Sequence, residues 1–405
     1  MRIRSLTFFC NPLNNNFEEV LKHIAATAQS CKAAFEKKGW DVQTIRLATT
    51  PFGQYTTEFD AVDKLLTLEE SAVKLGFNYI SAGPARLSNL DDYRLIVKIL
   101  SATRSVFATA ILTHPHKGIS MQAIKACAQI IVKASTITPD GFTNLRFCAM
   151  SQVQPFTPFF PAAYSYGTQP AFSLAMESAD AAIEGFKDAD DINGGRNRML
   201  AILEGAAQEL SIIAKANAKQ SGIAFKGFDF SLAPFPEDWC SLGGALEKLG
   251  LSQLGKMGTL TAAAILAEAL DQGNWPHVGF NGMMLPVLED SILAARTKSS
   301  AFTIKDLLMV SAVCGTGLDT VPLPGDIRAE EIETLLMDIA ALSLRLKKPL
   351  TARLMPVPGL KAGNLTSFNF EFFKNGNVMD FPAGKISAPL SRSNWVKIRK
   401  RKTYR

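Results

Sequence analysis

The chain of 405 residues is 47% hydrophobic and 20% charged, with a formal net charge of +6 at pH 7. These proportions are typical of a folded globular protein and exclude an intrinsically disordered chain. A chain of this length is well above the size at which a single core is hard to build, and it would accommodate two or three domains of average size.

Strand and helix patterns alternate through the first third of the chain. Apolar residues recur at helical spacing between Phe17 and Phe35, and Gly39 ends that pattern. The expected strands are 3–9, 42–47, 79–80 and 106–112, and the expected helices are 17–35, 60–75, 90–102 and 119–134. This alternation predicts a parallel α/β sheet or barrel.

The segment 147–176 interrupts the alternation and contains no charged residue. Pro155, Pro158, Pro161 and Pro170 exclude one continuous helix, so the segment is not a transmembrane span. Aromatic residues crowd between these prolines. The segment is interpreted as a buried crossover, as the wall of a ligand pocket or as an oligomer contact.

The remainder of the chain is mainly helical. The expected helices are 196–219, 241–250, 258–271, 288–297, 303–313 and 328–346, and the expected strands are 225–232 and 350–355. No internal repeat or long linker marks a boundary, so we expect one α/β barrel domain over residues 1–390 and a basic tail over residues 391–405.

The positive charge belongs to that tail. Seven lysines and arginines lie between Arg392 and Arg405 with no acid among them, and subtracting them from the net +6 leaves −1 for the rest. The tail is interpreted as a solvated extension, and the alternatives are binding of nucleic acid or an anionic surface, an edge strand, or a subunit contact. Nucleic acid is not expected as a partner elsewhere in the chain.

The six cysteines are spread along the chain without any CxxC pair. Their spacing favours reduced thiols over a disulfide framework or a zinc knuckle. The short apolar stretch after Arg2 and Arg4 runs into Asn11 and Pro12 and does not resemble a signal peptide. Together these features predict a cytoplasmic protein with no membrane partner.

The stretch 311–326, SAVCGTGLDTVPLPGD, carries the strongest local signal. Gly315 and Gly317 would let the backbone approach a ligand, and prolines stiffen the loop that we expect here. Cys314 is either a packed thiol at the end of an apolar helix or a nucleophilic or redox thiol.

Four acids are candidates for one site. Glu289 and Asp290 either complement a helix dipole or form a pair that transfers protons or binds a cation, and a divalent cation is the cofactor that such a pair would suit. Asp319 and Asp326 either cap the next elements or join that pair in one acidic cluster. Arg353 and Lys361 would supply the positive groups that fix an anionic substrate.

Five runs carry a resemblance to a known family. They are PAAY (161–164), KGFDFSLAP (226–234), GFNGMMLPVLEDS (279–291), CGTGLDTVPLPGD (314–326) and KPLTARLMPVPGLKAG (348–363). They resemble an uncharacterised prokaryotic family, domain of unknown function 711, over most of the chain.

That family is similar to pyruvate formate-lyase. The resemblance implies a ten-stranded α/β barrel with a finger loop through its middle, and it makes Cys314 the counterpart of the thiyl cysteine. No RVxGY-like motif follows Arg353, so the resemblance predicts the fold without glycyl-radical chemistry.

Three hypotheses about function follow. The first is an enzyme acting on a small anionic or carbonyl metabolite through Cys314, Glu289, Asp290 and Asp319. The second is a binding or regulatory protein that holds the same metabolite without turnover. The third is an assembly protein, and a homo-oligomer is expected for so apolar a chain.

Overall fold

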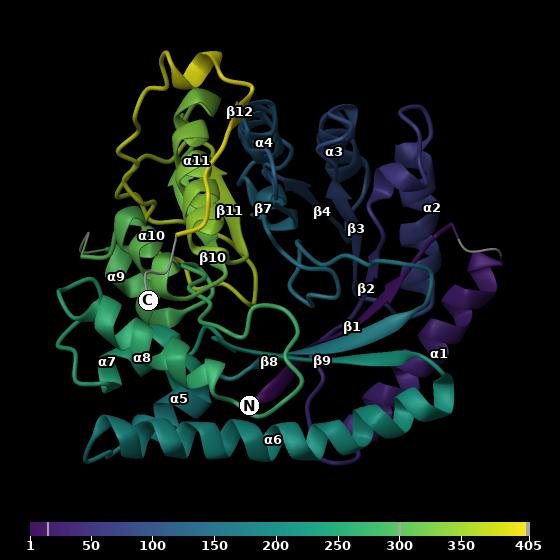
Figure 1. Ribbon diagram of the computed structural model, residues 1–405, viewed down its shortest axis with the longest axis vertical. Coiled ribbons are helices and arrows are strands. Elements are labelled where there is room, and N and C mark those ends of the chain that lie inside the picture. The colour runs from purple at the N-terminus through teal and green to yellow at the C-terminus, as the bar shows by residue number, and fades with distance from the viewer. Residues whose placement is uncertain (14–15, 299–300, 402–405) are drawn as a thin grey trace.

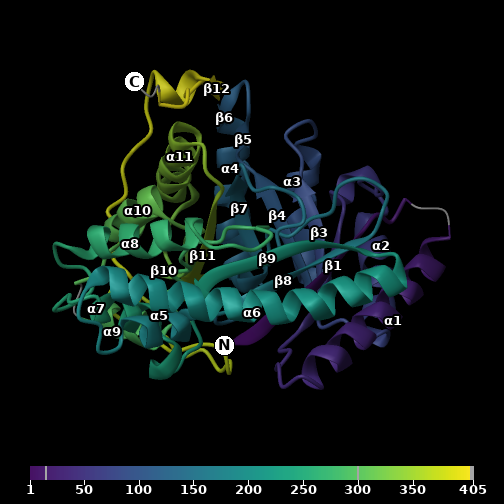
Figure 2. The same cartoon turned by 60° about the horizontal axis from the view of Figure 1, so that its bottom comes forward.

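The computed structural model describes residues 1–13, 16–298 and 301–401. These residues form one nine-stranded sheet, a second sheet of three short strands, and eleven α-helices. The helices lie around the outside of the curved large sheet, with the long α6 (Ile192–Ser221) along the bottom in Figure 1 and in front in Figure 2.

The strands of the large sheet come from the whole length of the chain. They are β1 (Arg2–Cys10), β2 (Ile45–Thr49), β3 (Tyr79–Ala85), β4 (Val106–Ile111), β7 (Phe147–Ser151), β8 (Ala171–Glu177), β9 (Ala224–Ala233), β10 (Gly317–Pro324) and β11 (Leu350–Val357). The small sheet contains β5 (Thr113–His114), β6 (Gly118–Ser120) and β12 (Trp395–Val396).

The other ten helices lie between these strands in the sequence. They are α1 (Phe17–Glu36), α2 (Ala61–Lys74), α3 (Asp91–Ala102), α4 (Met121–Ser135), α5 (Ala179–Phe186), α7 (Leu242–Lys248), α8 (Thr259–Asp271), α9 (Ser291–Thr297), α10 (Ile304–Val313) and α11 (Ala329–Leu346).

The strand order of the large sheet is β10-β11-β7-β4-β3-β2-β1-β8-β9. Strands β1, β2, β3, β4 and β7 are parallel to one another. Strands β8 and β9 are parallel to each other, and so are β10 and β11. Each pair runs antiparallel to the central strand beside it, β8 against β1 and β11 against β7. The sheet is therefore mostly parallel, as the alternation of strands and helices predicted.

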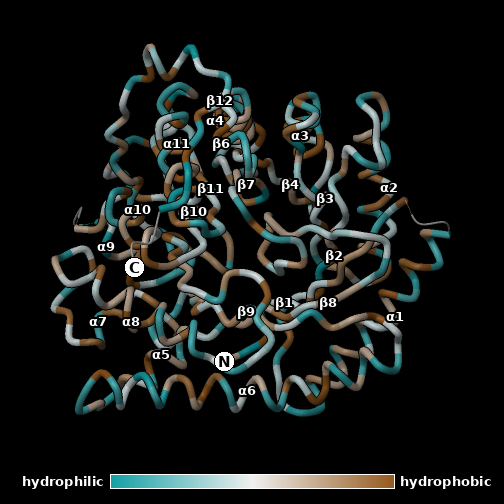
Figure 3. The backbone as a smooth tube through the Cα atoms, in the orientation of Figure 1, coloured by the Kyte–Doolittle hydropathy of each residue, from teal (hydrophilic) through white to brown (hydrophobic). Residues whose placement is uncertain are grey.

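The early helices form where apolar periodicity predicted them. The helix expected over residues 17–35 is α1, which buries Leu21, Ile24, Cys31 and Phe35 against the sheet. Figure 3 shows brown and teal stretches alternating along α1 and α6, as expected for helices with one buried face.

Two strands lie hidden in the charge-free segment. Both β7 and β8 are buried along their whole length. A strand covered on both faces has no polar alternation to reveal it, and the prolines lie in the irregular connection between the two strands.

The stretch expected to be a glycine-rich central loop is mainly a strand, and that prediction is wrong for residues 317–324. This strand, β10, pairs with β11 at an edge of the ladder, where Pro322 and Pro324 are tolerated because they lack an N–H. Gly317 begins it at φ +101°, and a Cβ there would lie 2.1 Å from the Thr351 carbonyl oxygen. A glycine at position 317 therefore allows β10 to lie close to β11.

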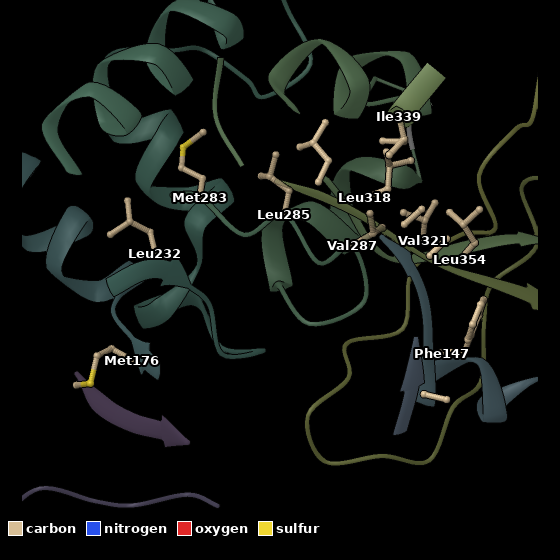
Figure 4. Close-up of a cluster of buried hydrophobic side chains, with 14 of the residues drawn as sticks. Phe147, Met176, Leu232, Met283, Leu285, Val287, Leu318, Val321, Ile339 and Leu354 are labelled. Atoms are coloured by element: carbon tan, nitrogen blue, oxygen red, sulfur yellow. The ribbon is translucent and has the colours of Figure 1, made fainter. Parts of the chain in front are cut away.

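The described strands do not close into the ten-stranded barrel that was expected. One irregular segment instead connects the two edge strands by single parallel bridges, through His277 and Met283 to β9 and through Pro286 to β10. Figure 4 shows Met283, Leu285 and Val287 of this segment among the buried side chains, from beside Leu232 of β9 to beside Leu318 of β10. The large sheet therefore has nine strands, and an irregular segment between its two edge strands, β9 and β10, bridges to both of them.

The basic tail is in contact with the body as far as it is described. Trp395 and Val396 pair with β6, and the Arg401 amide donates to the Arg345 carbonyl of α11. The charged side chains of Lys397 and Arg399 remain exposed. In the described part of the chain, no helix is both long and apolar enough to cross a membrane.

Candidate functional site

A pocket lies where the first residues of β2, β3 and β4 meet the last residues of β8 and the end of β9. Its empty volume is about 830 Å³, part of which is open to solvent. The charged residues that line it are Arg4, Arg46, Glu177, Asp229, Glu289 and Arg353. Its wall is otherwise largely aromatic and proline-rich, which is typical of a small-molecule site.

Arg353 on β11 is the centre of a buried ion-pair network. Its Nε donates to Asp319 on β10, and its Nη2 lies 3.0 Å from Glu289 Oε1. All three side chains are at least 95% buried. The β10–β11 pairing and the turn before α9 therefore bring together three residues that the sequence nominated.

Arg4 extends this network to the other side of the pocket. Its Nη2 donates to Glu289, and its Nη1 lies 3.8 Å from Glu177 Oε1. Glu177 also accepts from Arg2. Arg4 was not nominated, although an arginine inside an otherwise apolar strand such as RIRSLTFFC is itself a signal, because isolated charges are rarely buried.

Burial and the arginines compete for the protonation of the two central carboxyl groups. Burial raises the pKa of Glu289, but Arg4 and Arg353 outweigh it and hold that pKa below its ordinary value. Burial raises the pKa of Asp319 above its ordinary value despite the opposing effect of Arg353. The two acids therefore differ in how readily they take a proton.

Arg46 on β2 is the unusual member of the pocket. It is 8% exposed, and its Nε donates to Thr44 Oγ1 at 2.8 Å. Within residues 1–13, 16–298 and 301–401, no carboxylate lies within ion-pair distance of Arg46 and no acceptor is found for Nη1 or Nη2. Burial, followed by the charge of Arg4, lowers its pKa to about 9.

Aromatic rings hold the Arg46 guanidinium in place. Its carbon Cζ lies 5.6 Å from the ring centre of Tyr79 and 5.2 Å from that of Phe160. Phe107 packs edge-on against both rings. The guanidinium is therefore fixed between π-faces while its terminal nitrogens stay available for a ligand.

Asp229 on β9 is the pocket carboxyl group without an arginine partner among the described residues. It is 2% exposed and accepts hydrogen bonds from the amides of Ser231, Phe280 and Asn281 and from the Ser231 hydroxyl. Burial raises its pKa above the ordinary value, and these hydrogen bonds oppose the rise. A Cβ at Gly279 would lie 2.2 Å from Asp229 Oδ2, so only glycine fits there.

The remaining nominated residues lie outside the pocket. Cys314 ends α10, its sulfur accepts from the Met283 amide, and burial raises its pKa to about 11. Asp290 caps α9 through the amides of Ile292 and Leu293. It also accepts from the Ser241 hydroxyl.

The other four do not line the pocket either. Asp326 and Lys361 are exposed in adjoining loops, where the Gly325 amide donates to the Leu360 carbonyl. Gly315 precedes β10 at φ +120°, and Gly317 is packed against Thr351. The nine nominated residues therefore contribute Glu289 and Arg353 to the pocket lining, with Asp319 directly behind them.

All six cysteines are buried and free, and each lies in a described part of the chain. In the same described ranges, no group of three or more His, Cys, Asp or Glu side chains is arranged to hold a metal ion.

Comparison with known proteins identifies relatives along most of the chain. The UPF0210 protein of Acetivibrio thermocellus is 27% identical over an alignment of 405 positions, which spans 92% of this chain and 88% of the relative. That of Syntrophobacter fumaroxidans is 29% identical over 82% of this chain and 77% of its own. That of Neisseria gonorrhoeae is 26% identical over 87% of this chain and 82% of its own.

The match to a family model is equally extensive. The model described as "Uncharacterised ACR (DUF711)" covers residues 1–374, which include every residue that lines the pocket. It ends before the tail. The family predicted from five sequence runs is confirmed, and this chain belongs to the DUF711 family.

Proposed function

We propose that the pocket binds a small anionic metabolite through Arg46 and that the protein is an enzyme acting on it. The observation that carries this proposal is the largely buried Arg46 side chain, which lines the pocket and whose terminal nitrogens have no acceptor in the described part of the protein. A cation in a largely buried position is poorly solvated, and an anion bound to both nitrogens would receive charge-assisted hydrogen bonds from it.

A half-buried arginine, Arg146, illustrates a purely structural role. Arg146 also has no carboxylate partner among the described residues, but its Nη1 donates to the carbonyls of Thr103 and Val106 and its Nη2 to that of Leu100. Its terminal nitrogens are therefore satisfied by backbone. Arg46 lacks such acceptors and faces a pocket, which favours a ligand.

The chemistry of the pocket supports proton transfer better than thiol chemistry. Asp229 lines the pocket, its pKa is raised by burial, and no described cation forms an ion pair with it, so it is our candidate general acid or base. Glu289 and Asp319 are engaged by Arg353 and keep it in place. Cys314 does not line the pocket, so the proposal assigns the thiol no role.

Binding is tested with the free protein and a panel of small carboxylates and phosphates, by thermal shift and then calorimetry. We expect an anion to raise the melting temperature of the native protein, and Arg46→Gln to abolish that effect. Arg94→Gln, which removes a highly exposed arginine, is the matched control and should bind normally. A response that survives Arg46→Gln would contradict the proposal.

Turnover separates the enzyme from its alternative, a non-catalytic metabolite-binding or regulatory protein. Any anion that binds is incubated with the protein in D₂O, and exchange of its carbon-bound hydrogens is followed by NMR. We expect exchange or product with the native protein and neither with Asp229→Asn. Binding without exchange or product would favour the alternative.

The relation to pyruvate formate-lyase is also a proposal. Five parallel central strands, two parallel pairs at the sides that run antiparallel to them, and the bridging segment 277–286 support an irregular ten-membered barrel. An experimental structure with a continuous ladder between β9, that segment and β10 would establish it.

The homo-oligomer and the cytoplasmic location remain predictions as well. Light scattering of the purified protein and fractionation of cells test them respectively.

A further inference from the structure

We infer that Tyr79 is a second ligand-binding residue of the pocket and that the ligand is a carboxylate with an oxygen on the neighbouring carbon, that is, a 2-hydroxy or 2-oxo acid. Arg46 would hold the carboxylate, and the Tyr79 hydroxyl would donate a hydrogen bond to the neighbouring oxygen. This inference rests on the proposed function and specifies the contacts and the chemical class of the ligand.

The Tyr79 hydroxyl is a polar group of the pocket without a partner. In the part of the chain that the structure describes, it makes no hydrogen bond, whereas every other polar side chain of the lining makes at least one. Gln43 Nε2, for example, donates to Glu177 Oε1 at 3.1 Å, and Thr44 Oγ1 donates to the Arg4 carbonyl at 2.8 Å. The free donors of the lining therefore include the Tyr79 hydroxyl and the terminal nitrogens of Arg46.

The other described tyrosines show that this is unusual in the protein. Tyr55 shares a hydrogen bond with Thr49, and the hydroxyls of Tyr93 and Tyr164 donate to backbone carbonyls. Tyr166 is 73% exposed, so water serves its hydroxyl. Tyr79 is half-buried in the pocket wall. Because a tyrosine hydroxyl removed from bulk solvent normally finds a partner, a ligand that accepts from Tyr79 fits this position.

The sheet places Tyr79 beside Arg46. The two residues are direct partners in the register of the parallel strands β2 and β3, so their side chains project from the same face of the sheet. Arg46 Cζ lies over the Tyr79 ring, 5.6 Å from its centre. The guanidinium and the hydroxyl therefore lie at the same end of the pocket, within the span of one small ligand.

The position of the ring indicates which ligand oxygen the hydroxyl meets. A carboxylate bound by both terminal nitrogens of an arginine turns both of its oxygens toward them. The Tyr79 ring flanks the Arg46 guanidinium, so its hydroxyl approaches the ligand from the side. A third oxygen, on the carbon next to the carboxylate, is the acceptor that suits it.

Neighbouring rings keep the Tyr79 ring in place. Phe107 packs edge-on against it, with ring centres 5.1 Å apart, and also packs edge-on against Phe160, with ring centres 5.5 Å apart. Phe160 is the second ring over which Arg46 lies. The two donor groups are therefore preorganised, which reduces the entropy that ligand binding costs.

Three carboxylates that differ at one carbon test the inference by calorimetry. They are 2-hydroxybutyrate, 2-oxobutyrate and butyrate, and the two enantiomers of 2-hydroxybutyrate are measured separately. We expect the native protein to bind 2-oxobutyrate and one enantiomer of 2-hydroxybutyrate about threefold to tenfold more tightly than butyrate, as one further hydrogen bond allows. Butyrate binding as tightly as both oxygenated acids would overturn the assignment of the ligand class, and this comparison needs no variant.

Tyr79→Phe removes the hydroxyl and keeps the ring. We expect it to lower the affinity for the oxygenated acids to that for butyrate, to leave butyrate binding unchanged, and to leave the melting temperature of the ligand-free protein unchanged. Tyr93→Phe is the matched control, because its hydroxyl donates to the Ile111 carbonyl and Tyr93 does not line the pocket. It should melt at a lower temperature and bind all three acids as the native protein does.

The remaining outcomes each contradict a part of the inference. Unchanged affinities in Tyr79→Phe would remove Tyr79 from the binding site. An equal loss for all three acids would place the hydroxyl on the carboxylate itself and overturn the ligand class. If none of the three binds the native protein, the inference fails, whereas binding of inorganic phosphate that is lost in Arg46→Gln would leave the proposed function standing.

Discussion

Replacing Arg353 by methionine removes the cation that two buried carboxylates share. Asp319 and Glu289 both accept from Arg353, and they are 1% and 4% exposed, so water cannot replace it. Removing one partner of a buried ion pair typically costs about 3–5 kcal/mol. With an unfolding entropy of about 2.1 cal/mol/K per residue over 405 residues, that loss lowers the melting temperature by about 4–6 °C.

The loss of stability in Arg353→Met should depend on pH. Without Arg353, the folded-state pKa of Asp319 rises further above its unfolded value of about 3.9, whereas Arg4 still pairs with Glu289. The folded variant then binds protons more readily than the unfolded chain, so its stability increases as pH falls. The deficit relative to the native protein should be largest at pH 7 and smaller at pH 5.

Thermal unfolding followed by calorimetry at both pH values measures the effect. Arg94→Gln breaks an exposed ion pair with Asp91 and should cost less than about 0.5 kcal/mol. A deficit of Arg353→Met below about 1 kcal/mol, or one that grows on acidification, would show that these carboxylates do not depend on Arg353.

Arg46→Met should stabilise the ligand-free protein by about 1 kcal/mol or more at pH 7, because it removes a largely buried charge that has no ion-pair partner among the described residues. The same variant should lose anion binding. A midpoint of chemical denaturation equal to or lower than that of the native protein would contradict this prediction. Asp290→Ala removes the α9 cap and should cost about 1–2 kcal/mol without changing anion affinity, which calorimetry and denaturation measure together. Cys314 has a pKa near 11, so at pH 7.5 its alkylation by iodoacetamide should be at least about a hundredfold slower in the folded protein than in the denatured chain. Rapid labelling of folded protein, detected by mass spectrometry, would show that the thiol is accessible and reactive.

Hydrophobic periodicity predicted secondary structure correctly where one face of an element is buried and the other is exposed to solvent. The helix expected over 17–35 and α1 coincide to within one residue, and the helix expected over 303–313 is α10. It was insufficient where both faces are buried, as in β7, β8 and β10. In β10, glycines and prolines suggested a loop, although prolines are compatible with a strand at the edge of a ladder.

The site was predicted in part, for a related reason. Glu289, Asp319 and Arg353 meet in one network, but Asp290 and Asp326, the other two acids of the expected cluster, lie outside it. Arg46 was missed because TIRLA was interpreted only as a strand, and Asp229 because GFDFSLA was interpreted as a strand and a family run without a role for its acid. A single charge inside a buried strand was the available signal, but the sequence does not show which charges would face one another across a sheet.

The span of the network along the chain has a consequence for synthesis. Arg4 and its partner Glu289 are 285 positions apart, so at about 5–20 residues per second the ribosome needs roughly 15–60 s to supply the second after the first. During that interval Arg4 has emerged without Glu289, and Glu177 is the partner that becomes available to it first. The N-terminal half of the sheet is therefore expected to wait, open and incompletely paired, for chaperones or for the rest of the chain.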